Sequence, residues 1–238
     1  QTIAGKKKVT LELGGNAGVI IDKTADVNTL VKRIALGSYG QAGQSCIKVQ
    51  RIYVHEDKLG EFKKKFIEET KATKFGDPSN AETIVGPLID KTAADRIESW
   101  IKEAVDGGAK ILVGGKSNGL VIEPTVLTDV KPDMKVFCEE IFGPVVTLHT
   151  FQTIEVAVTG INNSAYGLQA GIFSNDFNNI FYAYENLEVG GVIVNDFPTY
   201  RIDHMPYGGI KDSGLGREGV KYAIEEMTES KLMVLNLF

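Results

Sequence analysis

The stretch VTLELGGNAGVII, residues 9–21, sets the framework of this chain. Residues 9–13 alternate apolar and polar side chains as a half-buried strand does, and the glycine pair at 14–15 then interrupts the alternation. Residues 18–21 form a short apolar run, which predicts a buried strand. Apolar residues then recur at helical spacing over 27–35. The stretch therefore predicts a strand, a glycine turn, a second strand and a helix, in that order.

Beyond this stretch, apolar runs and helical spacings alternate to the end of the chain. The further predicted strands and extended segments are 49–54, 111–113, 121–130, 145–151, 168–173, 192–194 and 230–238. The predicted helices are 27–35 with Asp26 or Thr24 as its cap, 59–67, 92–105 with Thr92 and Asp95 as a capping box, 153–162, 177–187, and one ending near 227. Strands that alternate with helices predict an α/β fold, with a largely parallel sheet flanked by helices.

Composition bounds the class of protein. The chain has 238 residues, 43% hydrophobic and 24% charged, which is typical of an ordinary globular protein. A net charge of −5 gives no basic footprint, so we expect no nucleic-acid partner. No apolar run reaches the roughly 18 residues of a membrane span, and two cysteines provide no disulfide framework. We therefore expect a reducing compartment, the cytoplasm, and no membrane association.

Residues 1–8 read as the tail of a preceding helix, which suggests a piece of a longer chain.

Cys46 is the leading candidate for chemistry. It follows Gly43, Gln44 and Ser45, a small and polar approach unlike the apolar wall of a core thiol. A free thiol has a pKa of about 8.5 and needs help to ionise at neutral pH. Lys48 or a neighbouring helix end could give that help. Cys138 is expected to be an inert, packed thiol.

A thiol that forms a covalent intermediate needs a second group to activate the water that releases it. Glu12, next to a glycine pair, is the candidate base, with a pKa tuned by partial burial; the alternative is a solvent-facing carboxylate on a strand. His55 and His149 lie at predicted strand ends and read as surface or core-edge residues, whereas His204 lies in an aromatic, polar loop. No segment supplies the third group of a cysteine-hydrolase triad, so that class is an alternative.

Two further motifs contain residues that could bind or react with a ligand. Glu139 and Glu140 are adjacent in an extended segment, so their side chains should point to opposite faces, and at most one should be functional. Residues 214–219, GLGREG, match the dinucleotide pattern G-x-G-x-x-G but follow no predicted strand. We expect them to form a tight loop that leads into a helix.

Five motifs together resemble the C-terminal half of the NAD(P)-dependent aldehyde dehydrogenase superfamily. In chain order they are LELGG at 11–15, GQSC at 43–46, EEIFGPV at 139–145, NNSAYGL at 162–168 and PYGGIKDSG at 206–214. They cover nearly the whole chain, and five in family order are highly specific.

The resemblance implies roles for individual residues. Cys46 would attack the aldehyde to give a thiohemiacetal and then a thioester, with its own backbone N–H as one oxyanion donor. Glu12 would activate the water that hydrolyses the thioester to the acid. Glu140 would hold the nicotinamide ribose of NAD or NADP, and Phe142 would lie beside the nicotinamide ring. No metal is expected.

The resemblance also places the substrate. Residues 196–204 would line the entrance, and the expected substrate contacts there are Phe197, Tyr200, Arg201 and His204. We hypothesise that Arg201 binds an anionic tail of the aldehyde; alternatively, it pairs with Asp203 or another carboxylate. Succinate semialdehyde enzymes of this family often carry an arginine six residues before the catalytic cysteine, and Gly40 occupies that position here.

The chain departs from the family in length. A full member is about twice as long and includes a dinucleotide-binding domain, which provides a second oxyanion donor and most cofactor contacts. We therefore predict a catalytic thiol domain at 9–227, an oligomerisation strand at 228–238 that pairs within a homo-oligomer, and poor activity of the isolated piece. The alternatives are a coenzyme A-acylating relative, which Glu12 argues against, and a non-catalytic fragment that serves subunit assembly.

Overall fold

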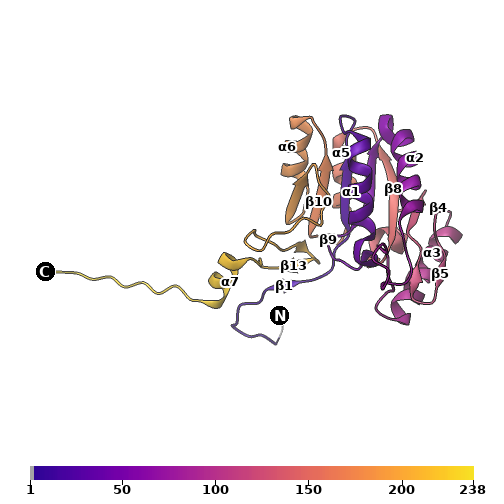
Figure 1. Cartoon of the computed structure of the whole chain (residues 1–238). Helices are drawn as coiled ribbons and strands as arrows, with labels where there is room; N and C mark the ends of the chain where they lie inside the picture. Colours follow the sequence, from indigo (N-terminus) through magenta and orange to yellow (C-terminus); the bar gives the residue numbers. More distant parts are fainter. Residues whose placement is uncertain (1–2) are drawn as a thin grey trace.

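The computed structural model describes residues 3–238, and a seven-stranded sheet forms its centre (Figure 1). Across the sheet the strands are Gly191–Val194 (β11), Gln169–Phe173 (β10), Ala17–Ile21 (β2), Val49–His55 (β3), Val145–Phe151 (β8), Thr125–Thr128 (β7) and Lys110–Val113 (β4). Every neighbouring pair is parallel except β7 and β4, which are antiparallel. The predicted α/β fold with a largely parallel sheet is confirmed.

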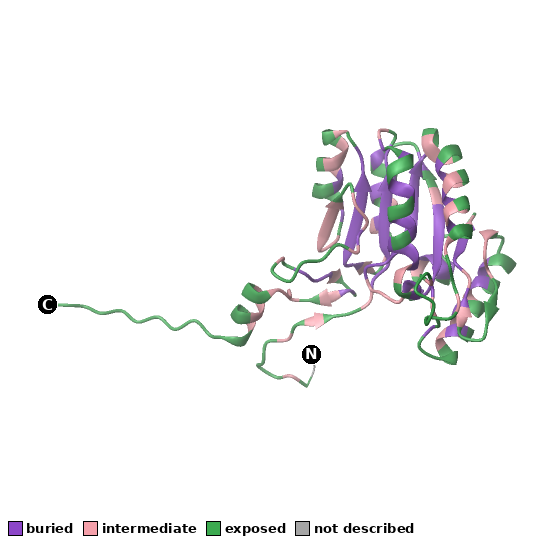
Figure 2. Ribbon diagram, viewed as in Figure 1, coloured by how far each residue is buried: buried purple, intermediate pink, exposed green. Residues whose placement is uncertain are grey.

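Helices cover both faces of this sheet, and its inner strands are buried, whereas the edge strands β4 and β11 are partly exposed (Figure 2). The helices are Val27–Tyr39 (α1), Gly40–Gly43 (the 3₁₀ turn η1), Glu56–Ala72 (α2), Lys91–Asp106 (α3), Lys135–Cys138 (α4), Ile154–Asn162 (α5), Phe177–Asn186 (α6) and Val220–Met227 (α7). In β2, Val19 and Ile21 pack in the core formed with α1, α2 and α3, whereas Ile20 packs in the core formed with α5 and α6. Consecutive residues of a strand point to opposite faces, which explains why β2 reads as a continuous apolar run.

Helix caps match the sequence in part. Asp26 accepts a hydrogen bond from the backbone N–H of Asn28 and caps α1, as one of the two expected candidates. The capping box at residues 92–95 is wrong, because α3 begins one residue before it. Asp90 has extended backbone and accepts from the N–H of Ala93 at 2.8 Å, so it provides the cap.

Short two-stranded sheets lie beside the main sheet. Leu11–Glu12 (β1) pairs antiparallel with Gly214–Leu215 (β13), and Tyr166–Gly167 (β9) pairs with Ile210–Lys211 (β12). Ser117–Asn118 (β5) and Val121–Ile122 (β6) form a hairpin. The predicted strand at 9–13 is thus shorter and lies outside the main sheet.

The dinucleotide-like motif belongs to one of these short sheets. Gly214, Gly216 and Gly219 all have positive φ, and α7 begins directly after the last of them. The loop that leads into a helix is as expected, with the short strand β13 inside it. The glycines therefore serve tight backbone turns and close contact with β1.

The two ends of the chain extend away from the sheet. Residues 228–238 contain no helix or strand and run out as an exposed, extended segment (Figures 1 and 2). Residues 3–7 form turns and a bend, not the expected end of a helix, and Gln1 and Thr2 lie outside the described residues. Within residues 3–238 there is no helix of the length and apolarity that a membrane crossing requires.

Candidate active site

A cavity of about 580 Å³ contains the candidate nucleophile Cys46. Its lining comes from three parts of the chain: the end of α1 with η1, the segment around the cysteine, and the loop after β11. The lining residues are Leu36, Gly37, Gly40, Gln41, Ser45, Cys46, Ile47, Lys48, Phe197, Thr199, Arg201 and Tyr207. A small molecule could therefore reach the Cys46 thiol within a pocket large enough to hold it.

A left-handed turn presents Cys46 to this cavity. Gln41, Ala42 and Gly43 all have φ between 54° and 68°, which reverses the chain after α1. At Gly43 an added Cβ would lie 2.2 Å from the carbonyl oxygen of Gly143. Only glycine combines this backbone angle with such a close approach, so the glycine before Cys46 fixes the approach loop against the segment before β8.

The Gly15 backbone packs directly on the Cys46 backbone. A Cβ added at Gly15 would lie 1.9 Å from the carbonyl oxygen of Cys46, so no larger residue fits at position 15. β1 ends three residues earlier, at Glu12. This contact brings the strand that carries the candidate base against the segment that carries the candidate nucleophile.

The thiol and the carboxylates interact. The pKa of Cys46 is raised to about 11, first by burial and then by the nearby Glu12 and Glu140 carboxylates, whereas a hydrogen bond from Tyr207 acts to lower it. The Glu12 carboxylate lies near enough to the thiol to raise its pKa, so the structure brings these two predicted residues together. Glu12 is exposed and lacks the partial burial we expected.

The expected activation of the thiol by Lys48 is wrong. The Lys48 side chain is buried, and its ammonium group donates to the carbonyl oxygen of Val145 at 2.6 Å. Burial lowers the pKa of Lys48 to about 7, and its charge acts on Glu140. Because the ammonium group faces the start of β8 and Glu140, it does not offset the burial that raises the pKa of Cys46.

Glu140 lies near enough to the thiol to raise its pKa, and Phe142 follows Glu140 two residues later. One carboxylate oxygen of Glu140 accepts from the N–H of Gly15 at 2.8 Å, and the other lies 2.7 Å from where a Cβ on Gly14 would be. Burial raises the pKa of Glu140. Glu139 is exposed, as expected if at most one of the pair is functional. Phe142 has a φ of 50° and keeps its side chain partly exposed.

The predicted substrate residues divide into two groups. Phe197 and Arg201 line the cavity, and a Cβ added at Gly37 would lie 2.7 Å from the Phe197 ring. Tyr200 and His204 are exposed and are not among the residues that line it. The guanidinium group of Arg201 pairs with Glu218 at 2.7 Å, so its partner is a carboxylate distant in sequence and not Asp203.

Sequence reasoning missed Tyr207 as a site residue. Its hydroxyl oxygen lies 3.4 Å from the Cys46 sulfur, and Arg201 lies over its ring at 4.1 Å. The signal was present, because Tyr207 belongs to the PYGGIKDSG motif. Nothing in that motif, however, indicates which distant segment its side chain meets.

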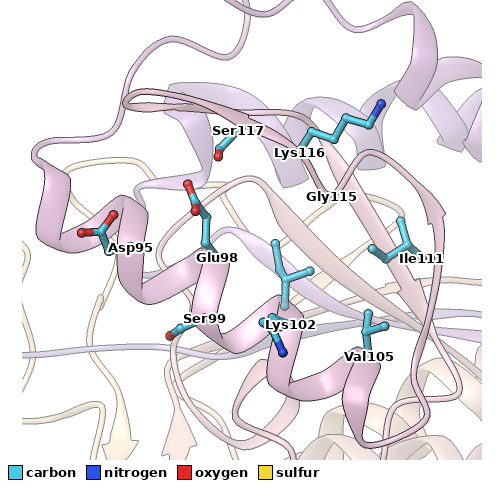
Figure 3. A pocket seen from close by; sticks show the side chains of 10 residues that line it. Asp95, Glu98, Ser99, Lys102, Val105, Ile111, Gly115, Lys116 and Ser117 are labelled. Carbon is cyan, nitrogen blue, oxygen red and sulfur yellow. The ribbon is translucent and has the colours of Figure 1, made fainter.

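The remaining histidine and cysteine candidates lie in the core or at helix ends, away from the Cys46 cavity. The His55 ring is buried, more than expected, and it accepts from the N–H of Asp57 and caps α2. His149 lies half-buried within β8, as a core-edge residue, and burial lowers its pKa to about 4. Cys138 is half-buried and packs against the main core. A second cavity, of about 600 Å³, lies along α3 (Figure 3) and contains none of the predicted site residues.

An α/β fold in which a thiol lines a cavity and a carboxylate lies near that thiol is typical of enzymes that work through a covalent thiol intermediate. The sequence model described as "Aldehyde dehydrogenase family" matches residues 1–233. The chain belongs to the aldehyde dehydrogenase family.

Relatives support this assignment along nearly the whole chain. The 3-sulfolactaldehyde dehydrogenase of Priestia aryabhattai is 50% identical over 98% of this chain and 49% of its own length. The lactaldehyde dehydrogenase of Methanococcus aeolicus is 43% identical over 98% of this chain and 50% of its own. The crystal structure of aldehyde dehydrogenase 21 from Physcomitrella patens, in complex with the reaction product succinate, is 50% identical, with a TM-score of 0.96 over 98% of this chain and 49% of that one. The chain thus spans about half the length of the proteins it matches.

Proposed function

We propose that this chain is the catalytic half of an NAD(P)-dependent aldehyde dehydrogenase, which oxidises a small aldehyde to a carboxylic acid through a thioester on Cys46. The observation that carries the proposal is the convergence of Cys46 and Glu12. The thiol lines the cavity, and the charge of the nearby Glu12 carboxylate raises the pKa of that thiol. Membership of the family supports the reaction class. The catalytic domain is proposed at 9–227.

The proposed steps use groups of this chain. The Cys46 thiolate attacks the aldehyde carbonyl carbon, a carbon–sulfur bond forms, and the carbonyl oxygen becomes the oxyanion of a thiohemiacetal. Within residues 3–238 the backbone N–H of Cys46 donates no hydrogen bond, so it is available to that oxyanion. After oxidation to the thioester, Glu12 takes a proton from a water molecule, which attacks the acyl carbon. The acid leaves, and the sulfur is restored.

The position of Glu12 favours hydrolysis over transfer to coenzyme A. A thioester can be released by water or by another thiol, and only release by water requires a general base beside it. Glu12 is exposed, so water can reach its carboxylate, and it is near enough to influence the thiol. The coenzyme A-acylating alternative is therefore disfavoured.

The cofactor proposal rests on Glu140 and Phe142. One Glu140 oxygen is anchored on Gly15, and within the described part of the chain the other has no hydrogen-bond partner, so it can accept from the hydroxyl groups of a ribose. Phe142 offers a partly exposed aromatic face two residues away. These residues fit NAD or NADP, which when bound supplies the hydride acceptor for the oxidation. With so few cofactor contacts of its own, the isolated chain is expected to be a poor dehydrogenase.

The substrate is proposed to be a small aldehyde with an anionic tail. Arg201 lines the same cavity as Cys46, and its guanidinium group is about two-fifths exposed. Its pairing with Glu218 is compatible with this role, because an exposed ion pair is weak and a substrate anion can compete for the cation. The relatives named for 3-sulfolactaldehyde and for a succinate complex concern anionic compounds, whereas the lactaldehyde relative names an uncharged one.

Assembly into a homo-oligomer through residues 228–238 is part of the proposal. Six apolar side chains of this segment are at least 70% exposed in the single chain: Leu232, Met233, Val234, Leu235, Leu237 and Phe238. An extended apolar segment of this kind gains stability by pairing with an open sheet edge of a second copy. Two unpaired cysteines support a reducing, cytoplasmic setting. Assembly without catalysis, the remaining alternative, leaves the convergence of Cys46 and Glu12 unexplained.

The test is chemical acylation of the chain, which requires no cofactor. p-Nitrophenyl acetate should acetylate Cys46, with p-nitrophenolate leaving and the thiol proton passing to solvent. Peptide mass spectrometry should find the acetyl group on Cys46 and not on Cys138, and Cys46→Ser should abolish the burst of nitrophenolate while Cys138→Ser preserves it. Equal, slow acetylation of both cysteines would favour the assembly-only alternative.

A further inference from the structure

The Tyr207 hydroxyl group contacts the sulfur atom of Cys46. Its oxygen lies 3.4 Å from the Cys46 sulfur, and within residues 3–238 the hydroxyl has no other hydrogen-bond partner. The residue is 3% exposed, so the protein screens its hydroxyl group from bulk solvent. A buried hydroxyl normally keeps a hydrogen bond, and here the thiol provides it.

The surroundings of Tyr207 hold its ring in place. Its backbone N–H and carbonyl exchange hydrogen bonds with Glu218, at 3.1 and 2.6 Å. The Glu218 carboxylate binds Arg201, and the Arg201 guanidinium group lies 4.1 Å from the centre of the Tyr207 ring. The ring is thus fixed from the backbone side and from one face, and its hydroxyl is aimed at the sulfur.

We propose that Tyr207 is a catalytic residue whose hydroxyl group donates a hydrogen bond to the Cys46 thiolate. This inference rests on the proposed function, in which Cys46 is the nucleophile. The thiol proton leaves to solvent or to a base, and Tyr207 keeps its own proton throughout. Burial raises the pKa of Tyr207, so the hydroxyl stays protonated and remains a donor at the pH values where the thiolate forms.

The hydrogen bond from Tyr207 is important because the neighbouring carboxylates disfavour ionisation of the Cys46 thiol. Burial and the charges of Glu12 and Glu140 all raise the pKa of Cys46, whereas the Tyr207 hydroxyl group lowers it. A hydrogen bond to an ionised acceptor is stronger than one between neutral groups, so the contact selectively stabilises the reactive form. A phenylalanine at position 207 would keep the packing and lose this donor.

The experiment compares Tyr207→Phe with Tyr39→Phe. Tyr39 is a matched control, because it is fully buried and its hydroxyl oxygen lies 3.2 Å from the Thr70 hydroxyl oxygen, in the core. The readout is the rate at which iodoacetamide alkylates Cys46 between pH 7 and 10.5, followed by peptide mass spectrometry with Cys138 as internal reference. Tyr207→Phe should raise the pKa of Cys46 by about one, the expected effect of one hydrogen bond to a charged group. Because the pH range lies below that pKa, the change should appear as slower alkylation of Cys46 throughout the range.

At pH 8 the expected rate loss is about threefold. The thiolate fraction falls about tenfold, and a more basic thiolate compensates with about threefold greater nucleophilicity. Tyr39→Phe should leave the Cys46 profile unchanged even if it lowers stability. A Cys46 profile in Tyr207→Phe that superimposes on that of the unmodified chain would overturn the inference.

A second variant covers the case in which Tyr207→Phe fails to fold. Site-specific 3-fluorotyrosine at position 207 keeps the ring and provides a stronger donor, so Cys46 alkylation at pH 8 should become faster, and no change would count against the inference. The acetylation test at Cys46 is independent of this comparison. If Cys46 is acetylated but its alkylation rate at each pH is the same whatever residue occupies position 207, the proposed function stands and the proposed role of Tyr207 is wrong.

Discussion

Replacement of Glu12 by glutamine should change two steps of the Cys46 chemistry in opposite directions. Glu12→Gln removes a negative charge from beside the thiol, and that charge raises the pKa of Cys46. It keeps the size of the side chain and the pairing of β1 with β13. Formation of the acyl intermediate should therefore become slightly easier, while its hydrolysis loses the proposed base.

The structure sets the size of each effect. Burial is the largest cause of the raised pKa of Cys46, about 11, and Glu12 shares the remainder with Glu140. We therefore expect Glu12→Gln to increase the thiolate fraction about threefold at a pH below the pKa of Cys46, and acylation about twofold once the lower basicity of the thiolate is included. Loss of a general base typically costs 10²–10⁴ in rate, so thioester hydrolysis should fall at least about a hundredfold.

The assay separates the two steps with p-nitrophenyl acetate. The initial burst of nitrophenolate reports acylation, and the slower steady state reports hydrolysis of the acetyl thioester. Glu12→Gln should keep a burst at least as fast as that of the unmodified chain, followed by an almost flat steady state with acetylated Cys46 accumulating. Glu139→Gln, which changes an exposed carboxylate beside Glu140, is the control and should leave both phases unchanged. An unchanged steady state in Glu12→Gln would refute the assignment of Glu12 as the base.

Two further predictions concern the substrate and the assembly. In a longer chain that includes the remaining half of the family fold, Arg201→Ala should reduce kcat/KM for 3-sulfolactaldehyde about tenfold to a hundredfold and change that for lactaldehyde less than threefold, because only the first carries an anionic group for Arg201. Equal losses for both aldehydes would contradict the anion-binding role. Deletion of residues 228–238 should convert the oligomer to a monomer in light-scattering measurements, because it removes the exposed apolar segment; an unchanged mass would show that assembly uses another surface.

Much of the fold could be predicted because its signals are local. The glycine pair after β1, the apolar run of β2 and the helical spacing of α1 each lie within a few residues, and the structure contains these elements near the expected positions. The cap of α3 was misplaced because Thr92 and Asp95 satisfy the same local pattern as the true cap, Asp90. Extended backbone at Asp90 decided between them, and the sequence does not display backbone angles.

The chemistry of the site depends on contacts that no local pattern contains. The raised pKa of Cys46 comes from burial and from carboxylates far away in sequence, so the polar, glycine-rich approach to the thiol does not reveal it. The same holds for Lys48, which is two residues from Cys46 yet directs its ammonium group to Val145. Arg201 was recognised as a possible substrate contact, but its carboxylate partner, Glu218, is brought to it only by the backbone pairing with Tyr207.

A crystal structure of the chain carrying an acetyl group on Cys46 would test whether the Cys46 sulfur and the Glu12 carboxylate act on the same bound group. We predict that the acetyl group occupies the cavity lined by Arg201 and Tyr207, and that one water molecule bridges its carbonyl carbon and the Glu12 carboxylate. An acetyl group on Cys46 with Glu12 turned to a separate surface, and no water between them, would contradict the proposed mechanism.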